Sequence, residues 1–376
     1  MIISIFLGAL INYPGEKIYY ILFSLVFNGL LLKGFYRQKF YFESFFSALL
    51  WLGFWLKFSI RTLSEDYSFK EPIGQFDFTP QAFDKVLGIS TIAGFTILCV
   101  FLIAHYIFRK RNFLKIDIDI FQRPDRFLEK RKYFYFLFLM ILLAVSFLNL
   151  HLGIYQRGSV PQYNPPVILR GIIVWLLLTG LAVASSTLIF WEIKTHKSPM
   201  TALIFALIES LLTNLSMLSR AFIINTIPQI WATFRQNGDY LVSRKAKIFL
   251  ALIFFGFFVT SIVLVNSVRA YYFVSPNIIH SAEQVKLGVY QNTISLFIDR
   301  WVGIEGVMSI SSYPGLGWEL WNKIASEKVE TSGTSYYDRE VGNSAYAKNT
   351  SSNHHYISLP GIIGFLYYPG SIIFLM

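Results

Sequence analysis

The chain has little charge and almost no cysteine. Only 15% of its 376 residues are Asp, Glu, Lys or Arg, whereas a soluble domain usually carries about 25%. The single cysteine, Cys99, excludes a disulfide within the chain and suits a small apolar packing residue. The sequence also lacks a glycine-rich phosphate loop, zinc-ligand spacing and a nucleophile elbow. These absences argue against ATP hydrolysis, and we expect neither a metal nor a cofactor.

Apolar and aromatic residues are abundant instead. Hydrophobic residues make up 54% of the chain, which includes 37 Phe and 22 Tyr. They form long runs, and a helix of about 18 or more apolar residues spans the ~30 Å hydrocarbon layer of a bilayer. The runs lie at 18–32, 45–60, 86–108, 134–150, 171–191 and 248–268, with further candidates at 1–11, within 201–234 and from 356 onward. The pattern predicts an all-α polytopic membrane protein with about 9–10 transmembrane helices.

Basic residues between the runs predict the orientation. The loop 109–132 is the most basic; its Lys and Arg residues are Arg109, Lys110, Arg111, Lys115, Arg123, Arg126, Lys130, Arg131 and Lys132. Because Lys and Arg concentrate in cytoplasmic loops, this loop is predicted to be cytoplasmic and the loops 61–85 and 151–170 to face outward. The same loops account for the net charge of +11. We therefore expect the positive charge to reflect orientation in a lipid bilayer, and we expect no binding of nucleic acid.

The stretch 201–234 decides the orientation of everything after it. Basic residues at 235–247 also suit the cytoplasm, so this stretch must cross an even number of times. We interpret it as a helical hairpin with its tip near Ser219 and Arg220. The chain then divides into a transmembrane bundle over 1–270, one large periplasmic loop over 271–355 and a last transmembrane segment over 356–376. Within the loop, we expect an amphipathic helix at 317–328, a weaker one at 285–298 and an irregular stretch at 330–352.

Ionisable residues inside apolar runs are costly, by about 2.5–3.5 kcal/mol at a helix centre, and are candidates for function. Lys57 lies near the end of its run, so we expect its ammonium to reach the membrane interface. Glu209 lies deeper in its run. A purely structural ion pair between Glu209 and Arg220 is the alternative to a functional role.

The expected outer segment carries a set of residues suited to a sugar diphosphate. Arginines bind phosphate oxygens bidentately, histidines act as bases near neutral pH, and tryptophan faces offer platforms for sugar rings. The candidates are Asp299, Arg300, Trp301, Glu305, Trp318, Trp321, His354 and His355 in this segment, and Arg269 just before it at the end of a span. Arginines and tryptophans also anchor membrane proteins at the interface, which is the structural alternative for each of them.

Two acidic pairs could hold a metal ion, but the sequence favours a metal site at neither of them. Asp117 and Asp119 have the spacing of a nucleotide-sugar metal site, but they alternate with apolar residues as in a short amphipathic strand. Glu65 and Asp66 would serve a metal-dependent glycosyltransferase, in which a chelator abolishes activity.

Several short stretches resemble the superfamily of O-antigen polymerases and O-antigen ligases. The large loop of that superfamily typically ends in a His-Asn-x-Tyr/Phe-like motif followed by a glycine-containing span. The matching residues here are Asn353, His354, His355, Tyr356, Leu359, Pro360, Gly361 and Gly364. Ser219 with Arg220, and the block 299–306, resemble polymerases of oligosaccharide repeat units. A second histidine stands where asparagine is usual, so either His354 or His355 is the aligned residue. Because the superfamily continues with further spans, we expect this sequence to be incomplete at its C-terminus.

The resemblance implies a glycosyltransferase of the bacterial inner membrane that joins undecaprenyl-diphosphate-linked repeat units at the periplasmic face. It implies that Arg220, Arg269 and Arg300 bind the diphosphate. It also implies that His354 or His355 acts on the acceptor hydroxyl, with Glu305 and Asp299 as rival bases. A chain-length regulator and a flippase would be its partners. The alternatives are an O-antigen ligase, which uses the same chemistry, and a transporter of lipid-linked oligosaccharides.

Overall fold

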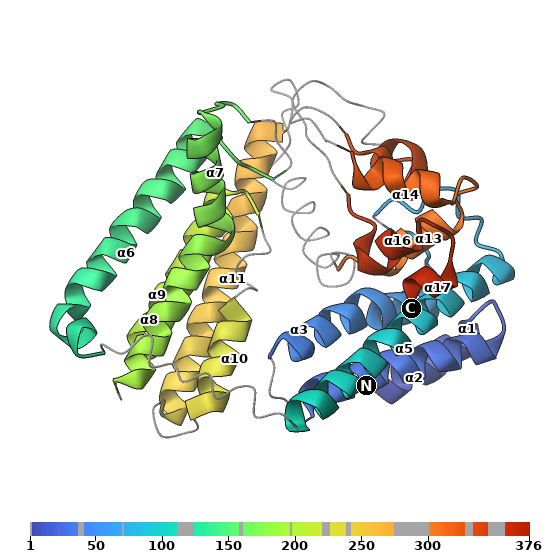
Figure 1. Cartoon of the computed structure of the whole chain (residues 1–376), viewed down its shortest axis with the longest axis horizontal. Helices are drawn as coiled ribbons and strands as arrows, with labels where there is room; N and C mark the ends of the chain where they lie inside the picture. The colour runs from blue at the N-terminus through green and yellow to red at the C-terminus, as the bar shows by residue number, and fades with distance from the viewer. Residues whose placement is uncertain are drawn as a thin grey trace. The chain divides into compact units, whose positions relative to one another are not determined.

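The computed structural model describes residues 2–36, 41–69, 71–110, 124–157, 161–195, 198–219, 226–237, 242–273, 301–327, 334–344 and 358–376. Its regular structure in these residues is entirely helical. The chain forms two compact units, one of 1–114 with 290–376 and the other of 115–289 (Figure 1). Both ends of the chain therefore belong to the first unit.

Four N-terminal helical segments build the base of the first unit. They are α1 (Ile2–Asn12), α2 (Lys17–Phe35), a continuous helix made of α3 (Tyr41–Leu50), the π-helical turn η1 (Trp51–Leu56) and α4 (Lys57–Leu63), and α5 (Pro80–Lys110). α2 packs against α3 and α5, and α1 packs against α4. The π turn widens the helix at Gly53, and such turns are frequent at functional sites.

Aromatic side chains form the core of this unit. Tyr20, Phe23 and Phe27 share one face of α2 and are fully buried. The Phe27 ring stacks on Phe54 with centroids 5.2 Å apart, and Tyr20 bonds to the Ser59 hydroxyl at 2.8 Å. Because large rings bury much apolar area in fixed geometries, they position η1 and α4 closely against α2.

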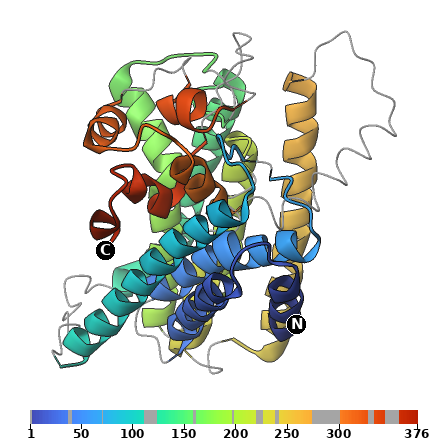
Figure 2. The same cartoon turned by 90° about the vertical axis from the view of Figure 1, so that its right-hand side faces the viewer.

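The C-terminal helices of this unit are short. They are α13 (Ile304–Ser311), α14 (Trp318–Ala325), the π turn η5 (Tyr337–Val341), α16 (Gly361–Tyr367) and α17 (Ile372–Leu375). α13 packs on α5 and α16, and α17 packs on α16 and α5. They lie against one side of the long N-terminal helices (Figures 1 and 2). The segments before residue 111 and after residue 300 therefore share one hydrophobic core.

The second unit is a bundle of longer helices. It contains α6 (Pro124–Leu152), a helix made of α7 (Val167–Trp175), the π turn η3 (Leu176–Gly180) and α8 (Leu181–Lys194), then α9 (Met200–Ser216), α10 (Thr226–Asn237) and α11 (Arg244–Phe273). α9 packs against α6, α8 and α11.

Buried polar contacts link the helices of this bundle. The Asn214 amide donates to the Ser261 hydroxyl at 3.0 Å, which joins α9 to α11. The buried Glu192 carboxylate accepts from Arg131 and from the Tyr135 hydroxyl, both at 2.7 Å, which joins α8 to α6. These contacts fix the register of α9 and α8 against their neighbours.

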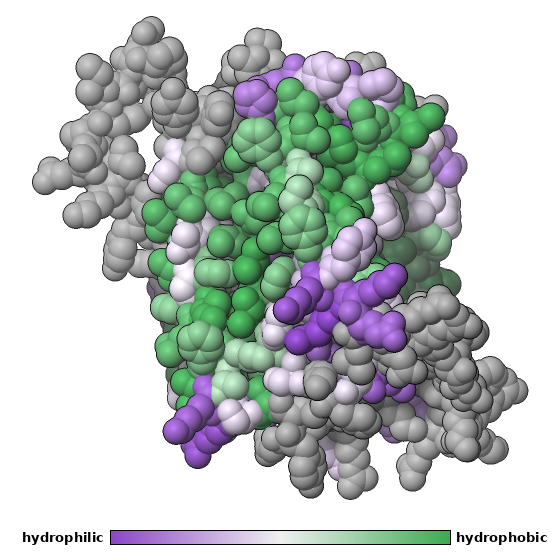
Figure 3. Space-filling view, turned by 90° about the vertical axis from the view of Figure 1, so that its left-hand side faces the viewer, coloured by the Kyte–Doolittle hydropathy of each residue, from purple (hydrophilic) through white to green (hydrophobic). Residues whose placement is uncertain are grey.

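The outer surface of this bundle is strongly apolar. Exposed hydrophobic residues lie along α6 from Tyr133 to Leu150: Tyr133, Phe136, Leu137, Met140, Ile141, Leu143, Phe147, Leu148 and Leu150. Figure 3 shows that hydrophobic residues cover most of the described part of this face. A patch of this extent is unusual for a soluble monomer and suits a hydrocarbon environment.

Five helices in the described residues are long and apolar enough to cross a membrane: 17–35, 80–107, 129–152, 167–194 and 244–265. Each coincides with an apolar run expected from the sequence. The run 45–60 lies in the continuous helix of α3, η1 and α4. In the stretch 201–234, expected as a hairpin, the structure describes α9 and α10, which pack against each other. Residues 220–225, with the expected tip at Arg220, lie outside the described residues, so the hairpin stays a prediction. The stretch after residue 356, expected as one last span, instead contains α16 and α17 with Gly370 at positive φ between them.

Candidate functional site

The candidate site is centred on α13, the helix that follows the block containing Asp299, Arg300 and Trp301. Every residue of α13 is buried. At its start, a Cβ on Gly303 would overlap the Gly53 carbonyl group of η1, and a Cβ on Gly53 would clash with the Val302 carbonyl. Two glycines therefore permit backbone-to-backbone contact between the π turn and the residues directly after Trp301.

Lys57 and Glu305 form a buried ion pair in this contact. The Lys57 ammonium lies 2.6 Å from Glu305 Oε1 and also donates to the Trp301 carbonyl. The side chains of Lys57 and Glu305 are 0% and 2% exposed. Lys57 therefore does not extend to an interface, as its place near the end of an apolar run had suggested. Its charge is neutralised within the protein by a residue 248 positions later.

Glu305 is strongly affected by this environment. Burial raises the pKa of its carboxyl to about 7, and the Lys57 ammonium opposes that rise. Glu305 Oε2 has no hydrogen-bond partner within the described part of the chain. Because the carboxyl is enclosed, the arrangement suits fixing the backbone at Trp301 better than taking a proton from a bound sugar.

The other side of α13 contacts the stretch that follows the two histidines. A Cβ on Gly306 would overlap the Pro360 carbonyl group, and a Cβ on Gly364 would lie 3.2 Å from the Gly306 backbone. The structure thus brings together 301–306 and 358–364, which are the described parts of the two blocks that carry the resemblance given above. Arg300 and His354 each lie six residues along the chain from the Gly306–Pro360 contact.

A buried aspartate fixes the residues on either side of 345–357. Asp338 is fully buried in η5 and accepts hydrogen bonds from the Ser335 hydroxyl at 2.6 Å and from the backbone N–H and the hydroxyl of Ser358. The Ser344 N–H donates to the Asp338 carbonyl at 2.9 Å. One residue therefore anchors both flanks of the stretch that contains His354 and His355.

The two tryptophans of the expected amphipathic helix lie in α14, which confirms that helix. The Trp321 ring packs on Phe365 and Phe374, with centroids 4.7 and 5.1 Å away. Trp318 contacts Phe374 at 4.9 Å and remains 55% exposed. Trp321 is thus engaged by α16 and α17, whereas Trp318 retains accessible ring surface for a ligand.

A polar cleft of about 370 Å³ lies beside the C-terminal end of α13. Its lining residues are Gln75, Phe76, Asp77, Thr79, Gln81, Ala82, Lys85, Ser311 and Ser312. The Lys85 ammonium donates to the Ser311 carbonyl at 2.7 Å, which ties α5 to α13. Exposed amides and hydroxyls of this kind can pair with the hydroxyl groups of a saccharide.

Several expected site residues are not placed by the structure. Asp299, Arg300, His354 and His355 lie outside the described residues, as does Arg220. Arg269 belongs to α11, and its side chain is outside the described part. Arg220 and Arg269 belong to the second unit and the other site residues to the first. The roles of all six stay predictions.

Two residues of this region were not recognised from the sequence. Lys57 was assigned to the interface because its partner is remote in the chain. Asp338 falls in the stretch 330–352 expected to be irregular, where the structure has the π turn η5. An acidic residue flanked by Tyr and Arg gives no sequence signal for burial.

Comparison of the chain with known protein families, with curated proteins and with solved structures finds no match in any of the three.

Proposed function

We propose that this chain is a membrane-embedded glycosyltransferase that joins undecaprenyl-diphosphate-linked oligosaccharide repeat units at the periplasmic face of the bacterial inner membrane. The observation that carries the proposal is the contact of Gly306 with Pro360 and Gly364. It joins the end of a block that resembles repeat-unit polymerases to a stretch that resembles the loop-end motif of the polymerase and ligase superfamily, more than 40 residues later. Two segments so far apart in the sequence touch in the structure. This contact favours a common site over a chance resemblance of each segment.

The membrane setting is supported by the five long apolar helices and by the apolar outer face of α6. The orientation follows from the basic loop 109–132. With the stretch 201–234 crossing twice, the loop 61–85, which contributes to the polar cleft, and the segment 271–355 lie on the same outer side. The cleft and α13 would then both face the compartment in which lipid-linked repeat units are available.

The reaction transfers a glycan from a lipid diphosphate to a sugar hydroxyl. The acceptor oxygen attacks the anomeric carbon of the donor, the bond from that carbon to the diphosphate oxygen breaks, and the acceptor proton passes to a base. The negative charge that develops on the leaving diphosphate needs preorganised cationic donors, which act strongly where water is scarce. We assign this role to Arg300 together with Arg220 and Arg269, the arginines that the resemblance implies, and the base to His354 or His355.

Glu305 and Lys57 act as positioning residues in this proposal. Their ion pair holds the Trp301 carbonyl, one residue after Arg300. Asp338 serves in the same way for the segment that contains the histidines. A catalytic arginine or histidine is effective only when held within a fraction of an ångström of its productive position.

The test is polysaccharide synthesis in a strain that lacks this gene. Complementation with the unaltered chain should restore long-chain polysaccharide, seen as a ladder on a gel. Arg300→Ala and Arg220→Ala should each abolish the ladder at unchanged protein level. Arg244→Ala, at the start of α11 and exposed, is the matched control and should leave the ladder intact.

The deletion strain also separates polymerase from ligase. Loss of a polymerase leaves single repeat units attached to the lipid core, whereas loss of a ligase leaves no repeat unit there. Chain growth retained in both arginine variants would contradict the charge-stabilising role.

A further inference from the structure

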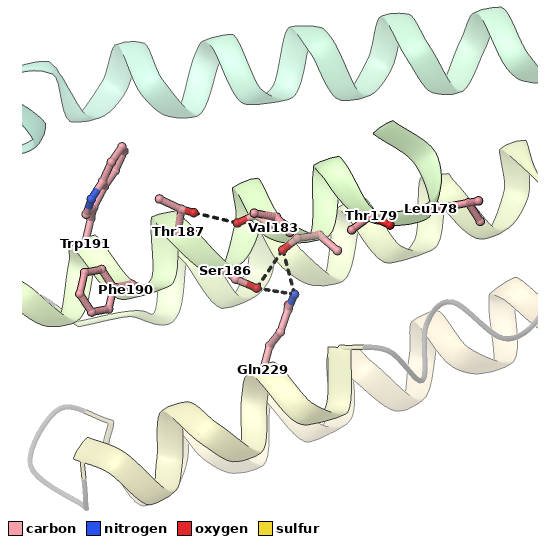
Figure 4. Close-up of a pocket in the computed structure, with 9 residues that line it drawn as sticks. Leu178, Thr179, Val183, Ser186, Thr187, Phe190, Trp191 and Gln229 are labelled. Atoms are coloured by element: carbon pink, nitrogen blue, oxygen red, sulfur yellow. Dashed lines mark hydrogen bonds between the residues drawn. The ribbon is translucent and has the colours of Figure 1, made fainter. Parts of the chain in front are cut away.

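The second unit contains an open groove on a helix long enough to span a membrane. The groove, of about 490 Å³, is lined by Leu178, Thr179, Ala182, Val183, Ser186, Thr187, Phe190, Trp191 and Gln229 (Figure 4). All but Gln229 come from η3 and α8, and Gln229 reaches the groove from α10. From Leu178 to Trp191 a helix rises about 20 Å, which exceeds the ~15 Å depth of one leaflet. The volume lies within the range of about 300–1,000 Å³ usual for ligand sites.

Three polar side chains in the groove, Ser186, Thr187 and Gln229, use their hydrogen-bond donors within the protein. The Ser186 hydroxyl donates to the Ala182 carbonyl and the Thr187 hydroxyl to the Val183 carbonyl, each at 2.8 Å. The Gln229 amide donates to the Ser186 hydroxyl at 2.9 Å and to the Ala182 carbonyl at 3.2 Å (Figure 4). A polar ligand such as a sugar would find these donors occupied. The remaining surface, which includes Val183 at 55% exposure, suits a hydrocarbon chain.

A lysine side chain lies at one end of the groove. The exposed Lys194 ammonium lies 5.6 Å from the centre of the Phe190 ring, which is a lining residue. The neighbouring Arg131 is already engaged by the buried Glu192. Lys194 is therefore available to a phosphate, and the charge of the site complements an anionic lipid headgroup.

We propose that this groove binds one acyl chain of an anionic glycerophospholipid whose phosphate lies beside Lys194. A phospholipid is favoured over the polyprenyl substrate because the basic residues near Lys194 predict the cytoplasmic side, whereas the proposed reaction occurs at the opposite face. The inference depends on membrane insertion and is independent of glycosyl transfer.

Photo-crosslinking of the purified full chain tests the proposal. A phosphatidylglycerol with a photoreactive group on its acyl chain should label peptides that contain 178–191. Val183→Trp fills the groove and should reduce this labelling about tenfold. Ile172→Trp is the matched control, since Ile172 is 50% exposed on α7 and does not line the groove. Equal labelling in the two variants, or labelling spread evenly over α6 and α11, would overturn the proposal.

The headgroup contact is tested by native mass spectrometry with phosphatidylglycerol and with zwitterionic phosphatidylcholine. Lys194→Gln should weaken phosphatidylglycerol binding about fivefold, as expected for one basic residue at an anionic lipid surface, and leave phosphatidylcholine binding unchanged. Lys245→Gln is the control, because Lys245 is an exposed lysine at the start of α11 and does not line the groove. On the unaltered chain, a polyprenyl diphosphate that displaces the bound lipid better than phosphatidylglycerol would overturn the phospholipid assignment.

Discussion

The backbone N–H of Ser358 lies 3.1 Å from Asp338 Oδ2, and the Ser358 hydroxyl donates to the same carboxylate. The two residues are 20 positions apart, and the stretch between them contains both candidate histidines. The carboxylate also accepts from Ser335, so it joins the backbone near residues 335, 338 and 358.

Replacement of Asp338 should destabilise the first unit. Asp338→Ala leaves the buried Ser358 N–H and hydroxyl without an acceptor, which should cost about 2–4 kcal/mol because bonds to a charged group are worth about 1.5–3 kcal/mol each. Thermal unfolding in detergent measures this loss. Asp66→Ala is the control: Asp66 is an exposed partner of Arg61, so its loss should change stability far less than the loss of Asp338. An equal effect of the two substitutions would contradict the anchoring role.

Lys57 and Glu305 should show strong energetic coupling. Lys57→Met alone leaves a buried carboxylate without its partner, which should cost about 3–5 kcal/mol. The double variant with Glu305→Leu removes both charges and should recover most of that stability. A double-mutant cycle on unfolding midpoints gives the coupling energy. Additive effects of the two substitutions would show that the side chains do not interact.

The stability of the chain should depend on pH through Glu305. Burial raises the pKa of its carboxyl from 4.5 to about 7, so the folded chain holds this proton more tightly than the unfolded chain. The protonated Glu305 therefore makes its full contribution to stability below the pKa of the carboxyl in the unfolded chain. That contribution is lost as the pH rises through the pKa of the carboxyl in the folded chain. Unfolding followed from about pH 5 to about pH 8 should show a fall in stability that is smaller in Glu305→Gln. The same fall in both proteins would assign it to another group.

Gly306 should tolerate no side chain. Gly306→Ala places a Cβ on the Pro360 carbonyl group, where only backbone atoms would have to move. Such overpacking should cost about 3 kcal/mol and abolish polysaccharide growth. Gly256→Ala is the matched substitution in α11, where no atom lies within 4 Å of the added Cβ; it should stabilise the helix by about 0.5–1 kcal/mol. Chain growth retained in Gly306→Ala would remove the main support for the proposed site.

The polar cleft beside α13 should affect chain length. A double variant, Gln75→Ala with Gln81→Ala, removes two exposed amides from its lining. If saccharide hydroxyls pair with them, the ladder should shift to fewer repeat units at unchanged protein level. Glu65→Gln, on the same loop and outside the cleft, provides the comparison. An identical ladder in all three proteins would exclude the cleft as a saccharide site.

Hydropathy predicts the helices of this chain well. Five long helices match the expected runs because a helix in lipid must satisfy its own backbone and be apolar along its length. The amphipathic helix at Trp318 and Trp321 was also predictable, since its apolar face meets α16 and α17. These helices could be predicted because the spacing of apolar residues along each one is set by its own sequence.

The contacts of the candidate site were not predictable in the same way. Lys57 lies three residues from the end of its apolar run, which suggested an interface, yet its partner is supplied by α13. The expected last span is divided because Pro360 precedes α16 and Gly370 adopts positive φ after it. Asp338 gave no signal because the burial of a single carboxylate depends on distant backbone donors. Tertiary partners decide these features, and one sequence does not identify them.

The separation of Lys57 from Glu305 has a consequence for biosynthesis. At about 5–20 residues per second, the ribosome needs roughly 12–50 s to cover the 248 residues between them. During that interval Lys57 lacks its Glu305 partner, and the N-terminal helices lack the packing of α13. Completion of the first unit therefore waits for the late part of translation, and a nascent chain released before α13 would expose this gap to quality-control proteases.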